Sequence, residues 1–480
     1  MIKNNKKYLL ISTLLMCSIG MNSHADDYAH SIFVPRQLSY NPMYEDALVF
    51  DEYAHMGNEK FLLSAKPIYT QTVGNSIKRY FNIHHLCSMN VQENGTGNID
   101  SLWFQDISAI GSMYSSILAF NPIQKTYGAL IYGALMLPAD FAITINFAAV
   151  ARNNNMYICE SDIMNLGQVP GFSTLTQAFT STGLNYGKIC GTQSQGGVDD
   201  IQIKFLKNFS LCDDASLFGD IYALVGVPTG RGSQAVYLFE PIVGSNHAQF
   251  GLGLNAEKEF ELNMCDQFSL YGEFKWRYGF KATETRSFDM TPNGQWSRYM
   301  LFTTPTASAN PFFAINNLTF AADVTPRSSL DLLLAAHVGL DKFSFELGYN
   351  FWYRQAEIVC PCISLPDVGI ADLVGIAQLA NANPVTVTTS STANISQGVL
   401  PNSNQMVHDA TYTLVTPANI NVCSGAQAAS CSNAVFGSIG YTCDNRWHPI
   451  DLGVNASYEG AANSNTASVV SVWVNVDIQF

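Results

Sequence analysis

The sequence predicts an all-β protein that crosses a membrane as an antiparallel barrel. Three observations favour this fold class: a low content of charged residues, a short apolar segment near the N-terminus, and long runs in which apolar and polar residues alternate. Only 13% of the 480 residues are charged, whereas 47% are hydrophobic. A soluble domain carries about 25% charged residues, so the composition indicates a membrane environment.

The first 25 residues have the pattern of a secretory signal peptide. Lys3, Lys6 and Lys7 precede an apolar stretch that runs to about residue 20, and small residues end the segment before Asp26. A membrane-spanning helix needs about 20 apolar residues, which this stretch does not supply. We therefore assign residues 1–25 to a signal peptide of an exported protein.

Removing this segment makes the chain more acidic. Without its three lysines, 21 basic residues remain against 38 acidic ones. A protein that binds nucleic acid through phosphates needs the opposite balance. We therefore expect no nucleic-acid partner.

The alternating runs have the period of two that is typical of a strand with one wet face. In residues 343–355, aromatic and aliphatic side chains occupy one face, and polar side chains occupy the other. Six such strands in the second half of the chain contain eight charged residues, all on the face opposite the apolar one. These are Glu273, Lys275, Arg277, Asp331, Glu346, Arg354, Asp451 and Asp477. A barrel in lipid has this segregation, because a charge on its outer face is strongly disfavoured.

The last strand carries the most specific signal. Val472, Val474, Val476, Ile478 and Phe480 alternate with Trp473, Asn475, Asp477 and Gln479. This ending resembles the closing strand of bacterial outer-membrane β-barrel proteins, in which the barrel-assembly machinery recognises a terminal Phe and alternating apolar positions. The resemblance implies that Phe480, Ile478 and Val476 form an assembly signal. It also implies a bacterial outer-membrane location in contact with outer-membrane lipid.

The family topology places Phe480 in the periplasm, with short periplasmic turns and long outer loops. Assigning strands on that basis predicts a barrel of 14 to 16 strands within residues 61–480. Fourteen ranges qualify: 61–72, 79–91, 108–120, 125–137, 139–152, 199–209, 216–228, 244–260, 264–282, 328–340, 343–357, 434–442, 448–459 and 467–480. Residues 296–303 and 312–322 supply two more in the larger barrel. Residues 26–60 lack strand rhythm, and we interpret them as a periplasmic extension or a plug.

Charged and polar side chains on the inner face are the candidate pore-lining residues. They are Glu273, Lys275, Arg277, Asp331, His337, Glu346 and Arg354. Rows of charges tune solute selectivity in channels. The same charges can instead brace the barrel across its lumen, and the sequence does not decide between these roles.

The cysteines suggest disulfides in the outer loops. The candidates are Cys159, Cys190, Cys360, Cys362, Cys423 and Cys431. Cys360 and Cys362 form the only close pair, and their spacing does not suit a standard zinc knuckle. In an exported protein disulfides are favoured, so we expect no metal and no cofactor.

These features predict an outer-membrane channel, similar to porins, for passive passage of small solutes. Asp199, Asp200 and His247 loosely resemble the catalytic groups of the omptin proteases, but His247 lacks an adjacent acidic partner, so we expect no enzyme. One alternative is a plugged transporter of hydrophobic compounds, similar to the long-chain fatty-acid transporter family, whose Asn-Pro-Ala start is partly echoed by Asn41-Pro42-Met43. Another is a barrel scaffold that presents adhesive outer loops. The solute and the oligomeric state stay open.

Overall fold

The structure is a computed structural model that describes residues 28–46, 60–75, 77–92, 97–104, 114–164, 172–210, 217–260, 267–304, 312–370, 393–397, 414–443 and 450–480. The predicted signal peptide, residues 1–25, lies outside these ranges. Twelve antiparallel strands form a closed barrel, because β5 pairs with both β1 and β6. In chain order they are β1 (Phe61–Val73), β5 (Ile123–Leu137), β6 (Phe141–Asn155), β9 (Ile201–Ser210), β10 (Leu217–Val227), β11 (Gln249–Phe260), β12 (Gln267–Gly279), β18 (Arg327–Leu340), β19 (Phe343–Arg354), β23 (Ser430–Cys443), β24 (Ile450–Ala461) and β25 (Ser468–Gln479).

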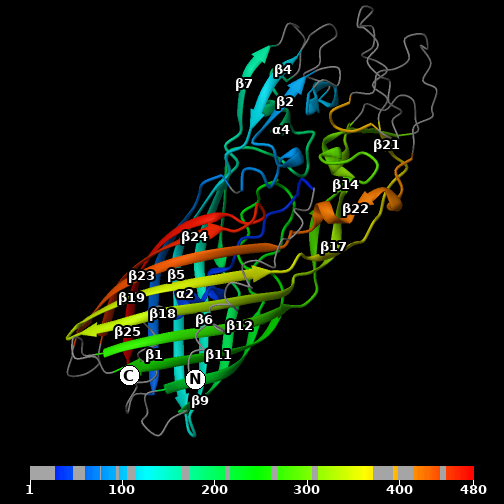
Figure 1. Ribbon diagram of the computed structural model, residues 1–480. Helices are drawn as coiled ribbons and strands as arrows, with labels where there is room; N and C mark the ends of the chain where they lie inside the picture. The colour runs from blue at the N-terminus through cyan, green and yellow to red at the C-terminus, as the bar shows by residue number, and fades with distance from the viewer. Residues whose placement is uncertain are drawn as a thin grey trace, which may run out of the picture.

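The barrel closes between the first and last strands of the chain. β25 pairs with β24 on one side and with β1 on the other. The Phe480 amide donates to the Phe61 carbonyl at 2.8 Å, and the two rings lie 5.9 Å apart. Phe480 and the short turn at Asp341 and Lys342 lie at the same end of the barrel, and the long connections lie at the other (Figure 1). The role of Phe480, Ile478 and Val476 in assembly stays a prediction.

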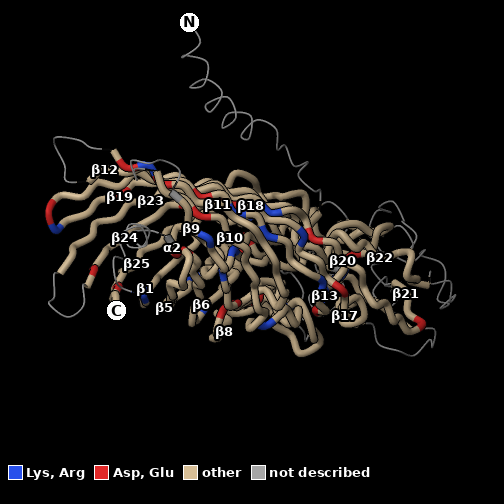
Figure 2. The backbone as a smooth tube through the Cα atoms, turned by 90° about the horizontal axis from the view of Figure 1, so that it is seen from below, with Lys and Arg blue, Asp and Glu red and all other residues tan. Residues whose placement is uncertain are grey.

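The two faces of the barrel wall differ as the alternation predicts. The outer face exposes aliphatic and aromatic side chains, among them Leu347 at 70% and Val454 at 64%. The inner face carries buried charged residues, and Figure 2 marks charged positions along β9 to β12 and β18. A closed barrel with a continuous apolar exterior is the form in which β-strands cross a bilayer. The fold is that of a bacterial outer-membrane β-barrel. In the described ranges no helix combines the length and apolarity of a membrane span.

The predicted count of 14 to 16 strands is wrong, because two predicted barrel strands and the optional pair lie outside the barrel. In residues 79–91, a 3-10 helix, Ile83–His85, interrupts the extended backbone before β2 (Ser88–Gln92). In residues 108–120, only β4 (Ser115–Ala119) is a described strand, and it pairs with β2. The pair 296–303 and 312–322 forms short strands of other sheets. The described parts of these four segments contribute residues to an apolar core, and their sequence pattern does not distinguish such a core from lipid.

That core belongs to an outer region built by the long connections. Its sheets contain β2, β3 (Ile99–Asp100), β4 and β7 (Cys159–Met164); β13 (Ala282–Ser287), β17 (Thr319–Thr325) and β20 (Ile358–Pro361); β14 (Asp289–Met290) and β22 (Ile420–Asn421); and β15 (Leu301–Thr303), β16 (Phe312–Phe313) and β21 (Gly369–Ile370). A further strand, β8 (Thr192–Val198), extends the barrel sheet beside the outer half of β6. Helix α4 (Leu175–Phe179) and the 3-10 helices η2 (Ile83–His85), η3 (Ser101–Trp103), η4 (Ser297–Tyr299), η5 (Ala314–Asn316), η7 (Pro417–Asn419) and η8 (Val422–Gly425) complete the region. These elements meet around a cluster of buried apolar residues, which we call the outer core. Trp103, Trp296 and Phe302 are fully buried within it.

Residues 28–46, which we call the inner segment, lie within the barrel rather than in its wall. The segment contains the 3-10 helix η1 (Leu38–Tyr40) and helix α2 (Pro42–Asp46). Figures 1 and 2 show α2 surrounded by barrel strands. Leu38, Met43 and Tyr44 share a buried apolar cluster with inward-facing residues of the wall. The inner segment therefore occupies the lumen.

We expect an arginine at position 274 to destabilise the barrel. Phe274 is exposed about midway along β12 and faces outward, between Glu273 and Lys275, which face inward. Phe274→Arg should cost about 2–4 kcal/mol of unfolding free energy if the residue lies near the midplane of the bilayer. Denaturant unfolding in lipid vesicles measures this cost, with Phe274→Leu as the control. Equal stability of the two variants would contradict the assignment of the lipid-facing side.

Candidate functional site in the barrel lumen

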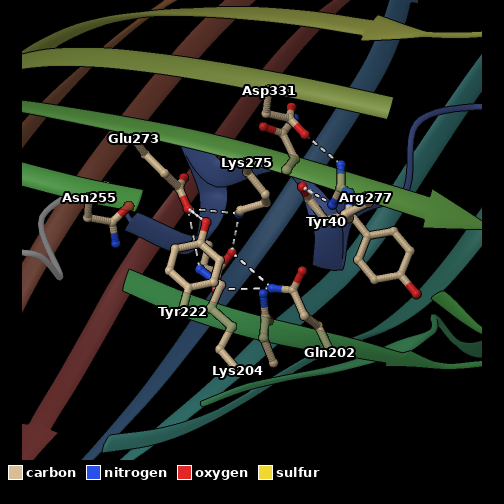
Figure 3. A network of polar contacts seen from close by, with 12 residues as sticks. Tyr40, Gln202, Lys204, Tyr222, Asn255, Glu273, Lys275, Arg277 and Asp331 are labelled. Atoms are coloured by element: carbon tan, nitrogen blue, oxygen red, sulfur yellow. Dashed lines mark hydrogen bonds and ion pairs between the residues drawn. The ribbon is translucent and has the colours of Figure 1, made fainter. Parts of the chain in front are cut away.

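A buried ion cluster joins the inner segment to the barrel wall. Glu45 of α2 accepts from Lys204 of β9 at 2.6 Å and from Lys275 of β12 at 3.0 Å. Lys275 also contacts Glu273 at 3.2 Å, and the Lys204 ammonium lies 3.6 Å from the same carboxylate. Figure 3 shows Lys204 of β9 reaching toward Glu273 and Lys275 of β12. We call these four residues the Glu45 cluster.

The members of the cluster pair with one another away from the protein surface. Its two carboxylates and two ammonium groups balance in charge, and all four side chains are buried. Gln202 donates to Glu45 at 3.1 Å, and the Tyr222 hydroxyl donates to Glu273. Ionised groups removed from water lose several kcal/mol of hydration each, which only mutual pairing offsets. Lys204 and Lys275 therefore depend on the carboxylate that the inner segment supplies.

The local sequence explains how Glu45 reaches this position. Asn41 precedes α2, and its side chain accepts a hydrogen bond from the Met43 amide at 3.1 Å. Pro42 begins the helix, where its missing N–H costs no hydrogen bond. Asn followed by Pro is a strong helix start, so the short helix begins at Pro42 and points Glu45 at β9 and β12. The Asn41-Pro42-Met43 motif thus has a structural role here.

A second set of contacts holds the inner segment on β12 and β18. Asp331 accepts from Arg277 at 2.6 Å and also pairs with Arg36 of the inner segment. Arg277 donates to the Tyr40 carbonyl at 2.8 Å, and its guanidinium lies 4.9 Å from the centre of the Tyr40 ring. Figure 3 shows Arg277 between Tyr40 and Asp331. One carboxylate of the wall therefore anchors two arginines, one of them from the inner segment.

Further contacts come from the remaining sides of the lumen. Asp199 accepts from the Leu38 amide at 3.0 Å and from the Ser39 amide at 3.4 Å. The Tyr44 hydroxyl lies 2.7 Å from the Ser471 hydroxyl, and the Tyr44 ring packs edge-on against Trp473. The same short segment is thus contacted from just before the start of β9 and from β25, as well as from β12 and β18.

The predicted pore-lining residues fall into three groups. Glu273, Lys275, Arg277 and Asp331 gather around the inner segment. His337 and Glu346 are partners in register on β18 and β19, near the turn that joins these strands. Arg354 lies at the other end of β19. All point inward, but whether they line a path for solutes stays a prediction, because the first group is engaged in contacts with the inner segment.

Two small cavities lie beside the inner segment. The larger, of about 70 Å³, lies between the segment and the outer ends of β12, β18 and β19, and we call it the arginine cavity. The other, of about 50 Å³, adjoins Thr70, Gln124 and Thr466. One water needs about 10–15 Å³ measured in this way, so each holds a few waters. Among the described residues, the inner segment occupies the lumen between β9, β12, β18 and β25.

An ion-pair chain borders the arginine cavity in the outer region. The His247 ring lies 2.9 Å from the Glu284 carboxylate, and Arg286 bridges Glu284 at 2.8 Å and Glu357 at 3.1 Å. Burial opposes the charge on His247, but the hydrogen bond and the charge of Glu284, together with the Phe280 carbonyl, outweigh burial and raise the pKa of His247. Burial likewise opposes ionisation of Glu284, yet Arg286 and His247 lower the pKa of Glu284 to about 2. The acidic partner that His247 lacks in the local sequence is therefore Glu284.

The expected disulfides are not seen in the structure. Cys159 lies on β7 and Cys190 lies in the connection before β8, whereas Cys360, Cys362, Cys423 and Cys431 lie on or near β20, η8 and β23. These elements pair with other partners, and no disulfide joins the cysteines of the described ranges. Those ranges also hold no group of three or more His, Cys, Asp or Glu side chains placed to bind a metal.

Comparisons with known proteins find similarity to solved membrane barrels. No protein-family model and no curated protein matches the chain. An outer-membrane channel from Pseudomonas putida F1 has 8% identity over 88% of this chain and 96% of its own, with a TM-score of 0.38. The Ralstonia pickettii toluene transporter TbuX has 11% identity over 89% and 91%, with a TM-score of 0.29. The β-domain of the Bordetella autotransporter BrkA has 7% identity over 88% and 100%, with a TM-score of 0.31.

Identities and TM-scores this low say nothing about substrate, and the class of this protein follows from its own barrel. A closed antiparallel wall with an apolar exterior defines an outer-membrane β-barrel protein. The contacts of the inner segment define it further as a barrel whose lumen is occupied by its own N-terminal residues.

We expect the stability of the outer region to depend on pH in both directions. The contribution of Glu284 is present above its ordinary pKa of 4.5 and is lost as pH falls toward about 2. The contribution of His247 is present below its ordinary pKa of 6.5 and is lost as pH rises through the raised value. Protection of the β13 amides should therefore be greatest between these ordinary pKa values. Hydrogen exchange, corrected for its intrinsic pH dependence, measures this protection.

His247→Gln is the control for that experiment. It should remove the loss of protection at higher pH and keep the loss at low pH, because Glu284 retains Arg286. A decline at higher pH that persists in the variant would show that another group is responsible.

Proposed function

We propose that the protein is a gated outer-membrane conduit for small solutes, in which the inner segment is the gate. The observation that carries this proposal is the position of Glu45, which supplies a buried carboxylate to two lysines of the barrel wall. A barrel opens a passage only if its lumen is clear. Passage therefore requires the inner segment to leave the Glu45 cluster.

This proposal departs from a permanently open porin. The two cavities described beside the inner segment each hold only a few waters, which supports a closed state in which this segment blocks a hydrated solute. Movement of the inner segment is enough to clear the lumen, and it leaves the backbone pairing of the wall strands intact. Solutes then pass by diffusion, and no covalent step is involved.

The charges of the lumen favour a polar solute over a hydrophobic one. Clearing the inner segment would leave Lys204, Lys275, Arg277 and Asp331 facing water along the path. Hydrophobic compounds gain nothing from such a lining, because burying charge against an apolar molecule is costly. The alternative of a plugged transporter shares the gate but needs an apolar route.

A scaffold for recognition is the second candidate, and one observation favours it. The long connections pack around an extensive outer core with fully buried aromatic residues. Such a rigid outer region can present a fixed surface to a partner. A scaffold of this kind would not conduct even without the inner segment, which separates it from the gated conduit.

We expect Glu45→Gln to open the barrel. The variant leaves Lys204 and Lys275 to share Glu273, and removal of one partner from a buried ion pair costs about 3–5 kcal/mol. The closed state loses this stabilisation, so the fraction of time spent open in single-channel recordings should rise about tenfold or more. Planar bilayers with purified, full-length protein provide the measurement.

Asp140→Asn is the matched control. Asp140 is a solvent-exposed carboxylate in a turn, 3.2 Å from Lys207, and its neutralisation should leave conductance at the wild-type level. Large, stable openings of the wild-type protein would overturn the gate and favour a porin. A variant lacking residues 28–45 that folds, as judged by heat modifiability, yet stays silent would overturn the conduit and favour the scaffold.

A further inference from the structure

We propose that the arginine cavity binds a small oxyanion, a carboxylate or a phosphate. This inference deepens the proposed function, because it names a class of solute for the same lumen. The role of the anion site in solute passage rests on the proposed function. The cavity lies at the outer end of the lumen, bounded by the inner segment on one side and by β12, β18 and β19 on the other.

The charged groups around the cavity are predominantly positive. Its lining includes four arginines, Arg36, Arg277, Arg327 and Arg354, together with His247. Its lining carboxylates are Glu284 and Glu357, and both are already engaged by Arg286, which lies behind them. A concave site lined by one sign of charge concentrates ions of the opposite sign. The cavity therefore attracts anions.

Arg354 is the residue that most clearly points to a ligand. Its guanidinium donates weakly to the Val34 carbonyl at 3.4 Å and to the Ser430 hydroxyl at 3.5 Å. Its buried Nε has no acceptor among the described residues. The ion pairs of the described residues include neither Arg354 nor Arg327. A partly buried guanidinium without a carboxylate retains donors that an oxyanion can satisfy.

Arg36 adds donors from the opposite side of the cavity. It pairs with Asp331 and lies 3.6 Å from the Glu459 carboxylate, but its buried Nε has no acceptor among the described residues. Asp331 is shared with Arg277, so one carboxylate serves two guanidinium groups. Asp331 therefore neutralises half of the positive charge of this pair of arginines, and Glu459 approaches Arg36 only at 3.6 Å.

Trp352 orders the two arginines that face each other across the site. The guanidinium of Arg36 lies 5.3 Å from the centre of the Trp352 ring, and that of Arg354 lies 5.6 Å from it. Both distances fall within the range of cation–π interactions. The indole is buried and holds the guanidinium groups in place before any ligand arrives.

The size of the cavity limits the ligand. Its volume of about 70 Å³ accommodates a few water-sized atoms. A carboxylate group or one phosphate has that size, whereas a larger ligand needs the inner segment to move. Planar arginine groups bind both oxyanions through paired hydrogen bonds. The inner segment contributes Arg36, so it completes the site only in the closed state.

Isothermal titration of the purified, folded, full-length protein tests this inference. Sodium acetate and inorganic phosphate serve as probes, and sodium chloride at equal ionic strength gives the background. We expect one site per chain for at least one oxyanion, and Arg354→Gln should weaken binding at least about tenfold. Binding of acetate alone assigns a carboxylate site, binding of phosphate alone assigns a phosphate site, and binding of both assigns a general oxyanion site.

Two further variants keep the test decisive. Arg327→Gln removes a second lining arginine and should also weaken binding, so a folding defect of Arg354→Gln does not end the experiment. Arg231→Gln changes an exposed arginine outside the cavity lining and should bind as the wild type does. Heats no larger than those of chloride, or equal affinity in all variants, would overturn the proposal. Anion binding without conductance in any variant would leave the site standing and remove the gated conduit.

Discussion

Every other feature of this molecule depends on one constraint: backbone polar groups in a bilayer must be paired within the protein. A sheet meets this constraint only when it closes, which β1, β5 and β25 achieve by pairing the start of the barrel with its end. Closure then sorts the side chains, because adjacent residues of a strand point to opposite sides. Apolar residues such as Leu347 face lipid, and the charged residues of the same strands are confined inside.

Confinement of charge creates the need for the inner segment. Two lysines inside a narrow barrel have few partners, and Glu273 alone cannot neutralise both Lys204 and Lys275. Glu45 supplies the second negative charge from the inner segment, which lies inside the barrel but is not part of its wall. In the same way, Arg36 of the inner segment adds a second ion pair to Asp331, which already pairs with Arg277. The inner segment and the wall therefore neutralise each other's charges. The free energy that holds them together is the difference between pairing Lys204 and Lys275 with Glu45 and hydrating these groups when the segment leaves.

Much of the wall could be predicted from sequence, because alternation is a local property. The ranges 125–137, 268–280 and 343–355 follow the period of two, and the structure places strands over nearly the same residues. The error in strand count arose where alternation serves a protein core, as in β4. Lys204 could have been found, since it lies on the polar face of a predicted strand. Glu45, Glu284 and Trp352 could not be connected to their partners, because each meets residues that are distant in the chain.

The inner segment is attached at two levels. Ala29 and Phe33 belong to the outer core, where His30 also stacks on Tyr80, while Tyr44 and Glu45 are held deeper among the barrel strands. The chain thus runs through the lumen from the outer end inward before β1 turns back along the wall. This path through the lumen has a consequence for assembly. The strands can close around an inner segment that is already in place, and the barrel then forms with its lumen occupied. Alternatively, the inner segment enters after the strands have closed, and assembly then passes through an intermediate with an empty lumen.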